Sequence, residues 1–194
     1  MFKMTEDINH SDIDDIFENI WEALHEGVKN RFSDYHLFNL ATRSNDHVEC
    51  RTVVLRDVDK NKKIIIFHTN NLSNKINEIK KNKKVTALFY SKEEKVQLRI
   101  KGDANIYNND KKCHNRWNLM STQSKECYFQ NIKPGTRIHA PADVHVDRHE
   151  ELSPDFSVIS IEIFSIDWLL LSSKGHKRLK FEKENNFKGY WIAP

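Results

Sequence analysis

The sequence lacks the long apolar runs and the paired cysteines that define several classes of protein. No stretch of its 194 residues reaches the roughly 18 consecutive apolar residues of a membrane-spanning helix. Residues 1–7 contain no apolar core of the kind that a secretory signal peptide has. The three cysteines, Cys50, Cys113 and Cys127, are widely spaced and form no Cys-x-x-Cys pair. These absences predict no membrane partner and reduced thiols, as in the cytoplasm.

The chain also lacks an internal repeat, a low-complexity tract and a shift in composition that would mark a domain boundary. We therefore expect residues 1–194 to form a single domain. Its apolar content of 38% and charged content of 30% describe a polar chain that can still bury a core. The net charge of +3 suits phosphorylated small molecules and does not require nucleic acid.

Hydrophobic periodicity separates a helical N-terminal segment from a series of strands. Apolar residues recur at helical spacing over 11–30, so residues 1–33 are predicted as a helical segment that packs on the remainder. The later apolar runs are rich in β-branched residues or alternate with polar ones. Strands are predicted at 35–42, 48–56, 64–69, 84–90, 96–102, 156–163 and 167–171, and helices at 73–82 and 110–120. This pattern predicts a mainly β protein with flanking helices, built as a closed or nearly closed antiparallel barrel.

The junction between the strand at 64–69 and the following helix has the features of an anion site. Ser73 is in position to cap the helix, and the first backbone N–H groups of a helix have no partners within it. Lys75 in the first turn opposes the helix dipole, which indicates another role for it. Arg51, Thr69, Ser73 and Lys75 are therefore candidates to bind one phosphate. The alternative is that Arg51 and Lys75 are solvated surface charges and the helix is merely capped.

Residues 131–155 are predicted to be a long irregular loop, and they contain a group of possible metal ligands. The candidates are histidines and aspartates at alternating positions, namely His139, Asp143, His145, Asp147 and His149. No second group of ligands accompanies them elsewhere in the sequence. We therefore favour an exposed polar loop and expect no metal.

The order of several short motifs resembles the pyridoxamine 5'-phosphate oxidase-like family, whose members are split barrels that bind flavin mononucleotide (FMN). The resemblance covers about residues 35–194. Its motifs are Leu40–Thr42, Arg51–Arg56, Phe67–Asn70, Ser73–Lys75, Ala87–Tyr90, Gln97–Gly102, Ile166–Trp168, Lys174–Arg178 and Trp191–Pro194. It implies an antiparallel, Greek-key-like split barrel that binds FMN at the interface of a homodimer.

The resemblance also implies roles for individual residues. Arg51 and Lys75 would meet the flavin phosphate, and Gln97 the ring system. Trp168 and Arg178 would reach the flavin from the other subunit. The full set of implied cofactor residues is Arg51, Thr52, Val53, Val54, Leu55, Arg56, His68, Thr69, Ser73, Asn74, Lys75, Gln97, Trp168 and Arg178. No catalytic residue is assigned.

Several positions depart from the vitamin B6 oxidases that the family includes. Arg56 stands where those enzymes have a lysine, and Lys174 and Lys177 replace an arginine and an acidic residue. The implied substrate contacts are Arg56, Arg116, Lys174 and His176. Since a lysine lacks the two-pronged donor set of arginine, we expect an FMN-dependent oxidoreductase of another small molecule.

Two alternatives stay open. The chain could be a genuine pyridoxamine or pyridoxine 5'-phosphate oxidase. It could also be a non-catalytic barrel that holds flavin, another cofactor or single-stranded nucleic acid. A nucleic-acid barrel needs exposed aromatic residues beside a basic groove, and Phe67 and Phe89 lie in apolar strands and are expected to be internal.

Overall fold

The strands of the computed structural model, which describes residues 12–146 and 151–194, form one antiparallel sheet. Its order is β3-β2-β1-β4-β5-β6-β7-β8, and a further pairing of β3 with β6 closes the first six strands into a barrel. The strands are β1 (Leu37–Ser44), β2 (His47–Asp59), β3 (Ile64–Asn70), β4 (Lys84–Ser91), β5 (Val96–Asn108), β6 (Phe156–Leu170), β7 (Lys177–Glu182) and β8 (Tyr190–Ile192). The predicted antiparallel barrel is therefore confirmed.

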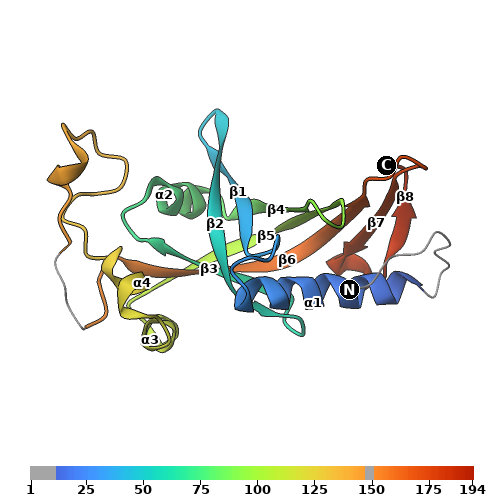
Figure 1. Cartoon of the computed structure of the whole chain (residues 1–194), viewed down its shortest axis with the longest axis horizontal. Coiled ribbons are helices and arrows are strands. Elements are labelled where there is room, and N and C mark those ends of the chain that lie inside the picture. Colours follow the sequence, from blue (N-terminus) through green and yellow to red (C-terminus); the bar gives the residue numbers. More distant parts are fainter. Residues whose placement is uncertain (1–11, 147–150) are drawn as a thin grey trace.

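Helices cover the barrel and its ends. The longest, α1, lies along one side of the barrel and reaches toward β7 and β8 (Figure 1). The short helix α2 follows β3, and α3 and α4 lie at the opposite end of the molecule from β7. The helices are α1 (Asp12–Lys29), α2 (Asn74–Lys81), α3 (Lys111–Asn118) and α4 (Thr122–Glu126), with 3-10 turns η1 (Pro141–Asp143) and η2 (Lys183–Asn185). No helix in the described part of the chain has the length and apolarity needed to cross a membrane.

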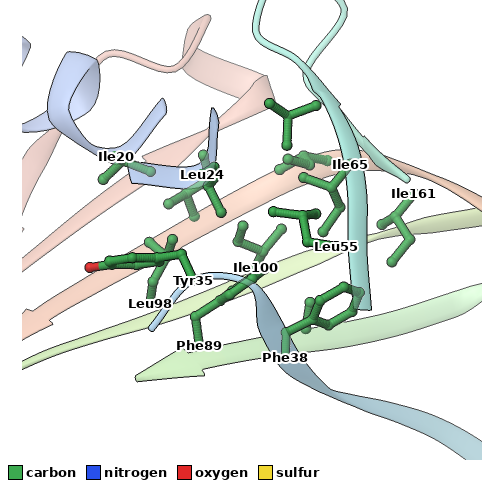
Figure 2. Close-up of a cluster of buried hydrophobic side chains, with 14 of the residues drawn as sticks. Ile20, Leu24, Tyr35, Phe38, Leu55, Ile65, Phe89, Leu98, Ile100 and Ile161 are labelled. Atoms are coloured by element: carbon green, nitrogen blue, oxygen red, sulfur yellow. The ribbon is translucent and has the colours of Figure 1, made fainter. Parts of the chain in front are cut away.

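The core forms because alternate residues of each strand point into the barrel. Figure 2 shows Leu55, Ile65 and Ile100 meeting in the interior, and Ile20 and Leu24 of α1 lying against them. This explains why the predicted 3.6-residue stripe of α1 is apolar: it covers one side of the barrel core. In the structure, α1 (Asp12–Lys29) packs on the barrel, and residues 1–11 of the predicted segment lie outside the described part.

A second apolar cluster holds α3 and the segment after it against the outer surface of β3 and β6. Its buried members are Ile66, Cys113, Trp117, Tyr128, Phe156 and Val158. The aromatic rings meet edge to face, with centroids 4.9 Å apart for Tyr128 and Phe156. This packing fixes the position of Arg116, which lies on α3 between the buried residues.

The strand predictions were wrong around residue 164 and at the C-terminus. β6 is one continuous strand rather than two, because the break in its apolar pattern is a bulge opposite Lys101 and Gly102. β6 pairs with β3, β5 and β7, so its backbone hydrogen bonds continue past the bulge. The polar strand β7 and the short β8 were not predicted, since they are strands through pairing at the edge of the sheet, β7 with β6 and β8 with β7.

Candidate functional site

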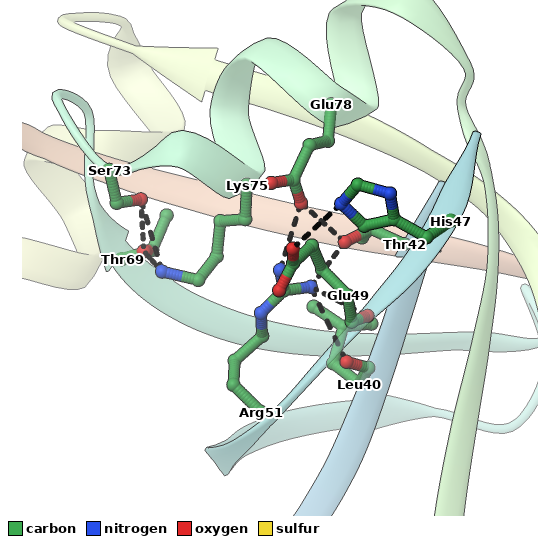
Figure 3. Close-up of polar contacts among 9 residues, drawn as sticks. All are labelled: Leu40, Thr42, His47, Glu49, Arg51, Thr69, Ser73, Lys75 and Glu78. Atoms are coloured by element: carbon green, nitrogen blue, oxygen red, sulfur yellow. Dashed lines mark hydrogen bonds and ion pairs between the residues drawn. The ribbon is translucent and has the colours of Figure 1, made fainter. Parts of the chain in front are cut away.

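The junction of β3 and α2 places two hydroxyl side chains beside the ammonium group of Lys75. The Lys75 Nζ atom donates to Thr69 Oγ1 and to Ser73 Oγ, each at 3.0 Å (Figure 3). Ser73 occupies the N-cap position of α2, as predicted, but its side chain makes no capping hydrogen bond. Its hydroxyl turns toward Lys75 instead, so the first N–H groups of α2 donate no hydrogen bond to the capping side chain.

Arg51 approaches the same end of α2 from β2. Its Nη2 atom donates to Glu78 Oε2 at 2.9 Å, and its Nη1 atom donates to the hydroxyl of Thr42. Nη1 also lies 3.4 Å from the carbonyl oxygens of Leu40 and Glu49. These partners come from β1, β2 and α2, so the guanidinium is held by three elements.

The two cations influence one another. Burial lowers the pKa of Lys75 from its ordinary value, and the positive charge of Arg51 lowers it further. The nearby carboxylate of Glu78 acts in the opposite direction. The local charge is therefore positive even with Glu78 included, since Arg51 and Lys75 outnumber it. Such a site favours an anionic group such as a phosphate.

The strand that carries Arg51 alternates between the two faces of the barrel wall. Leu55 is fully buried and Val53 packs against the core, so their side chains point inward. Thr52 and Arg56 are exposed, and Thr52 donates to Asn39 Oδ1 on β1 at 3.0 Å. Of the predicted cofactor residues on β2, Val53 and Leu55 could therefore contribute only backbone atoms to a ligand outside the barrel.

His68 lies on the outer side of β3, between the barrel and α3. Both of its ring nitrogens are buried, and neither has a hydrogen-bond partner among the described residues. Burial, together with the positive charges of Arg56 and Arg116, lowers the pKa of His68 to about 3. The ring is neutral at physiological pH and packs edge to face on Phe156 at 5.0 Å.

Arg116 and Arg56 form the second cationic group of the molecule. Arg116 pairs with Asp57 of β2, a partner that the sequence analysis did not identify. A signal for this pair was available, since Asp57 directly follows the predicted Arg51–Arg56 motif. The structure thus brings the predicted residues Arg56, His68 and Arg116 together.

The remaining predicted residues lie at the opposite end of the barrel. Gln97 of β5 is paired with Leu169, which is paired in turn with Arg178 of β7, so Gln97 and Arg178 are in one row across the sheet. The Arg178 guanidinium donates to both carboxylate oxygens of Asp167, at 2.9 and 2.8 Å, and Arg99 donates to the same carboxylate at 2.5 Å.

Trp168 does not face the same way as Arg178. Its indole is only 2% exposed and belongs to the barrel core, in register with Leu98 and Leu179. A side chain buried in its own subunit has no surface to offer a second one. The burial of Trp168 therefore argues against the expectation that it reaches the flavin of a partner subunit.

Lys174 and His176 lie in the turn between β6 and β7. His176 Nδ1 accepts a hydrogen bond from the Ser172 backbone at 3.1 Å. Figure 1 places this turn at the far end of the molecule from α3. Within one chain, Lys174 and His176 are therefore separated from the predicted substrate residues Arg56 and Arg116.

The histidine-containing loop shows no arrangement suited to a metal in its described part. The Asp143 carboxylate accepts hydrogen bonds from the backbone of His139 and Ala140 at 3.0 Å. Over 12–146 and 151–194, no three His, Cys, Asp or Glu side chains are grouped to hold an ion. Asp147 and His149 lie outside these ranges.

Comparisons with known proteins agree with this fold. Residues 18–108 match the family model of the pyridoxamine 5'-phosphate oxidase FMN-binding domain. The pyridoxine/pyridoxamine 5'-phosphate oxidase of Aliarcobacter butzleri is 34% identical over 97 residues. That match covers 47% of this chain and 45% of the relative, so the chain matches less than half the length of this curated protein.

Solved structures are similar over most of the chain. A pyridoxamine 5'-phosphate oxidase-related, FMN-binding protein from Nostoc punctiforme has a TM-score of 0.75 at 20% identity, covering 91% of this chain and 96% of its own. PhzG from Burkholderia lata, solved with tetrahydrophenazine-1-carboxylic acid, has a TM-score of 0.74 at 19% identity and covers 98% of both chains. At these identities the likeness establishes the fold.

The closed barrel and the family match over residues 18–108 define an FMN-binding split barrel. Residues 18–108 thus resemble the FMN-binding domain of the pyridoxamine 5'-phosphate oxidase family, and the cofactor of that domain is FMN.

Proposed function

We propose that this protein is an FMN-dependent oxidoreductase that acts on a small anionic molecule. The observation that carries the proposal is the pair of converging cations, Arg51 and Lys75, at the first turn of α2. A partly buried ammonium that donates to two neutral hydroxyls fits a phosphate better than it fits a structural role. The residues of this chain therefore fit the phosphate end of FMN.

Each group of residues has a separate task in this proposal. Lys75, Arg51, Thr69 and Ser73 hold the phosphate, with Asn74 beside them in the first turn of α2. The outer face of β2, with Thr52 and Val54, lies along the cofactor. Bound FMN supplies the hydride chemistry, and the chain positions it and excludes water from its surroundings.

The second cationic group gives the substrate class. Arg56 is exposed, and its side chain forms no hydrogen bond or ion pair with the other described residues. It lies near the neutral, buried ring of His68 and near Arg116, which pairs with Asp57. Such a group suits a heteroaromatic molecule with a carboxylate or a phosphate. The heterocyclic carboxylic acid bound by PhzG belongs to this class of compound and supports the proposal.

Gln97, Arg178, Lys174 and His176 would complete the site from a second subunit of a homodimer. The support for this step is the position of β7 and of the turn before it, which lie at the far end of the molecule from α2 and α3 (Figure 1). A cytoplasmic location stays a prediction, supported by the three free cysteines.

A test of this function starts with the colour of the purified protein. We expect a flavin absorption spectrum with about one FMN per chain. The bound flavin should be bleached by reduced nicotinamides or by a reduced heteroaromatic acid, and oxygen or another acceptor should restore it. A colourless protein that cannot be reconstituted with FMN would contradict the proposal.

A second candidate function is vitamin B6 phosphate oxidation. The 34% identity to the Aliarcobacter butzleri oxidase favours it. Arg56, Lys174 and Lys177 argue against efficient turnover, because they replace the residue types that those enzymes are expected to use. Turnover of pyridoxamine 5'-phosphate at roughly 1 per second or faster, the range of ordinary enzymes, would favour this second function.

A further inference from the structure

Glu78 is a buried carboxylate at the edge of the proposed phosphate site. It lies one turn beyond Lys75 on α2, and its residue is 8% exposed. Its Oε2 atom accepts hydrogen bonds from Thr42 Oγ1 at 2.5 Å and from Arg51 Nη2 at 2.9 Å. A negative group beside a phosphate is electrostatically unfavourable, so its place there calls for a function.

The contacts of Arg51 indicate what that function is. A guanidinium has five N–H donors in a rigid planar fork. Thr42, Glu78 and two backbone carbonyls engage Nη1 and Nη2, whereas no hydrogen bond from Nε is recorded among the described residues. Figure 3 shows the Arg51 guanidinium in contact with Glu78, and the Lys75 side chain beside them, turned toward Thr69 and Ser73.

We propose that Glu78, together with Thr42, is a positioning residue: it holds one edge of the Arg51 guanidinium so that the remaining donors face the flavin phosphate. This inference rests on the proposed function, because it concerns the same phosphate site. An arginine side chain has many rotamers, and fixing it before binding removes an entropic cost from the binding step. The preorganised donors then offset the repulsion between Glu78 and the phosphate.

The proposal is tested by comparing FMN with riboflavin, which has the same ring and no phosphate. Both dissociation constants are measured by flavin fluorescence on protein stripped of flavin. Glu78→Ala should reduce the preference for FMN over riboflavin about tenfold, the size of one hydrogen bond to a charged group, and leave riboflavin affinity unchanged. Glu78→Gln keeps an acceptor oxygen and should restore most of the preference.

Three further variants separate positioning from other effects. Glu49→Gln removes a carboxylate on the strand of Arg51 that pairs instead with exposed His47 at 3.6 Å, and it should leave the preference unchanged. Thr42→Val breaks the same cluster from β1 and should lower the preference. In an Arg51→Ala background, Glu78→Ala should have no additional effect, because Glu78 acts through Arg51.

The outcomes distinguish the two levels of inference. An unchanged or increased preference for FMN in Glu78→Ala would show that Glu78 only competes with the phosphate, and it would overturn the positioning role. A parallel loss of riboflavin affinity, or an additive effect in the Arg51→Ala background, would also overturn it by pointing to general structural damage. A wild-type protein that binds riboflavin as well as FMN would remove the phosphate site itself, and Glu78's role with it.

Discussion

Lys75 stands in the first turn of α2, where a positive charge opposes the helix dipole. Its ammonium is desolvated and shares its surroundings with Arg51, which lowers its pKa. Both effects are costly in the protein alone, and both become favourable when a phosphate binds. A charged side chain in this position is therefore better explained by a ligand than by the stability of the helix.

At the residue scale, we predict that Lys75→Met weakens FMN binding while riboflavin binding is retained. The lost interaction is a charge-assisted hydrogen bond, worth about 2 kcal/mol or roughly 30-fold in affinity. Flavin fluorescence titration measures both ligands. Lys80→Met, on the same helix, is the matched control and should leave both affinities as they are. Equal losses for FMN and riboflavin in Lys75→Met would argue against a phosphate contact.

A second residue-scale prediction concerns His68 and pH. Its pKa is lowered to about 3 in the folded protein, below its ordinary value of 6.5, so the unfolded chain binds more protons between these values. Stability should therefore rise with pH from 3 to 6.5, by up to about 1.4 kcal/mol per pH unit for this group. The acid side of the stability profile should thus depend on His68.

The measurement is the free energy of unfolding by urea at pH 4.5 and pH 7 in the wild type and in His68→Phe. The wild type should lose more stability on acidification than the variant does. His36→Phe is a histidine control, because its Nδ1 atom already has the Gly27 carbonyl as a partner at 2.7 Å. Identical pH profiles for wild type and His68→Phe would contradict the buried neutral state of His68.

At the scale of elements, the close pairing of the antiparallel strands β5 and β6 depends on a glycine. A Cβ atom at Gly102 would lie 2.5 Å from Ile161 Cγ2 and 2.6 Å from the carbonyl oxygen of Glu162. Neither atom can move aside easily, because the Ile161 side chain is packed in the core and the Glu162 oxygen belongs to the backbone of β6. Gly102, which lies opposite the bulge in β6, thus lets β5 and β6 approach more closely than a residue with a Cβ atom would allow.

We therefore predict that Gly102→Ala destabilises the barrel by about 1–3 kcal/mol, as overpacked core positions do. Thermal or urea unfolding would measure the change. Asn105→Ala, at an exposed position on the same strand, should alter stability by no more than about 0.5 kcal/mol. A neutral Gly102→Ala variant would show that β6 can move away from β5 without cost.

At the scale of the whole molecule, the residues of the proposed site lie at two opposite ends of the folded subunit. Arg51, Lys75 and Arg56 belong to the end with α2 and α3, and Gln97 and Arg178 belong to the end with β7. A homodimer would bring the two ends of different subunits together. The prediction can be tested by complementation, because each subunit would supply only part of a site.

Lys75→Ala and Arg178→Ala should each lower flavin-dependent activity. Mixing the two variants under conditions that exchange subunits should recover activity, since one of the two sites in each mixed dimer would have both wild-type contributions. Activity per subunit should approach one quarter of wild type for random exchange of two inactive parents. If activity does not recover although subunit exchange is demonstrated, then Lys75 and Arg178 act in one site of the same subunit, or at least one of them lies outside the site.

The sequence by itself determined the barrel, and it also predicted the phosphate end of the proposed site. Both follow from local rules: alternation and β-branched runs define strands, and the strand–helix junction at Thr69 to Lys75 exposes helix N–H groups beside cations. The same local rules failed for β7, whose polar residues form a strand only by pairing with β6. They also missed the pairing of Arg116 with Asp57, because the two residues are far apart along the chain.

Tertiary structure alone decided which face each residue occupies and what it meets there. The register of β5, β6 and β7 buries Trp168 in the core and leaves Arg178 on the outside, although the motif analysis had grouped them. Glu78 contacts Arg51 and Thr42 because β1, β2 and α2 pack together around the Arg51 guanidinium. No spacing of residues in the sequence predicts this contact. The physical reason is that burial and charge pairing depend on contacts between distant segments, whereas strand and helix formation depends mostly on near neighbours.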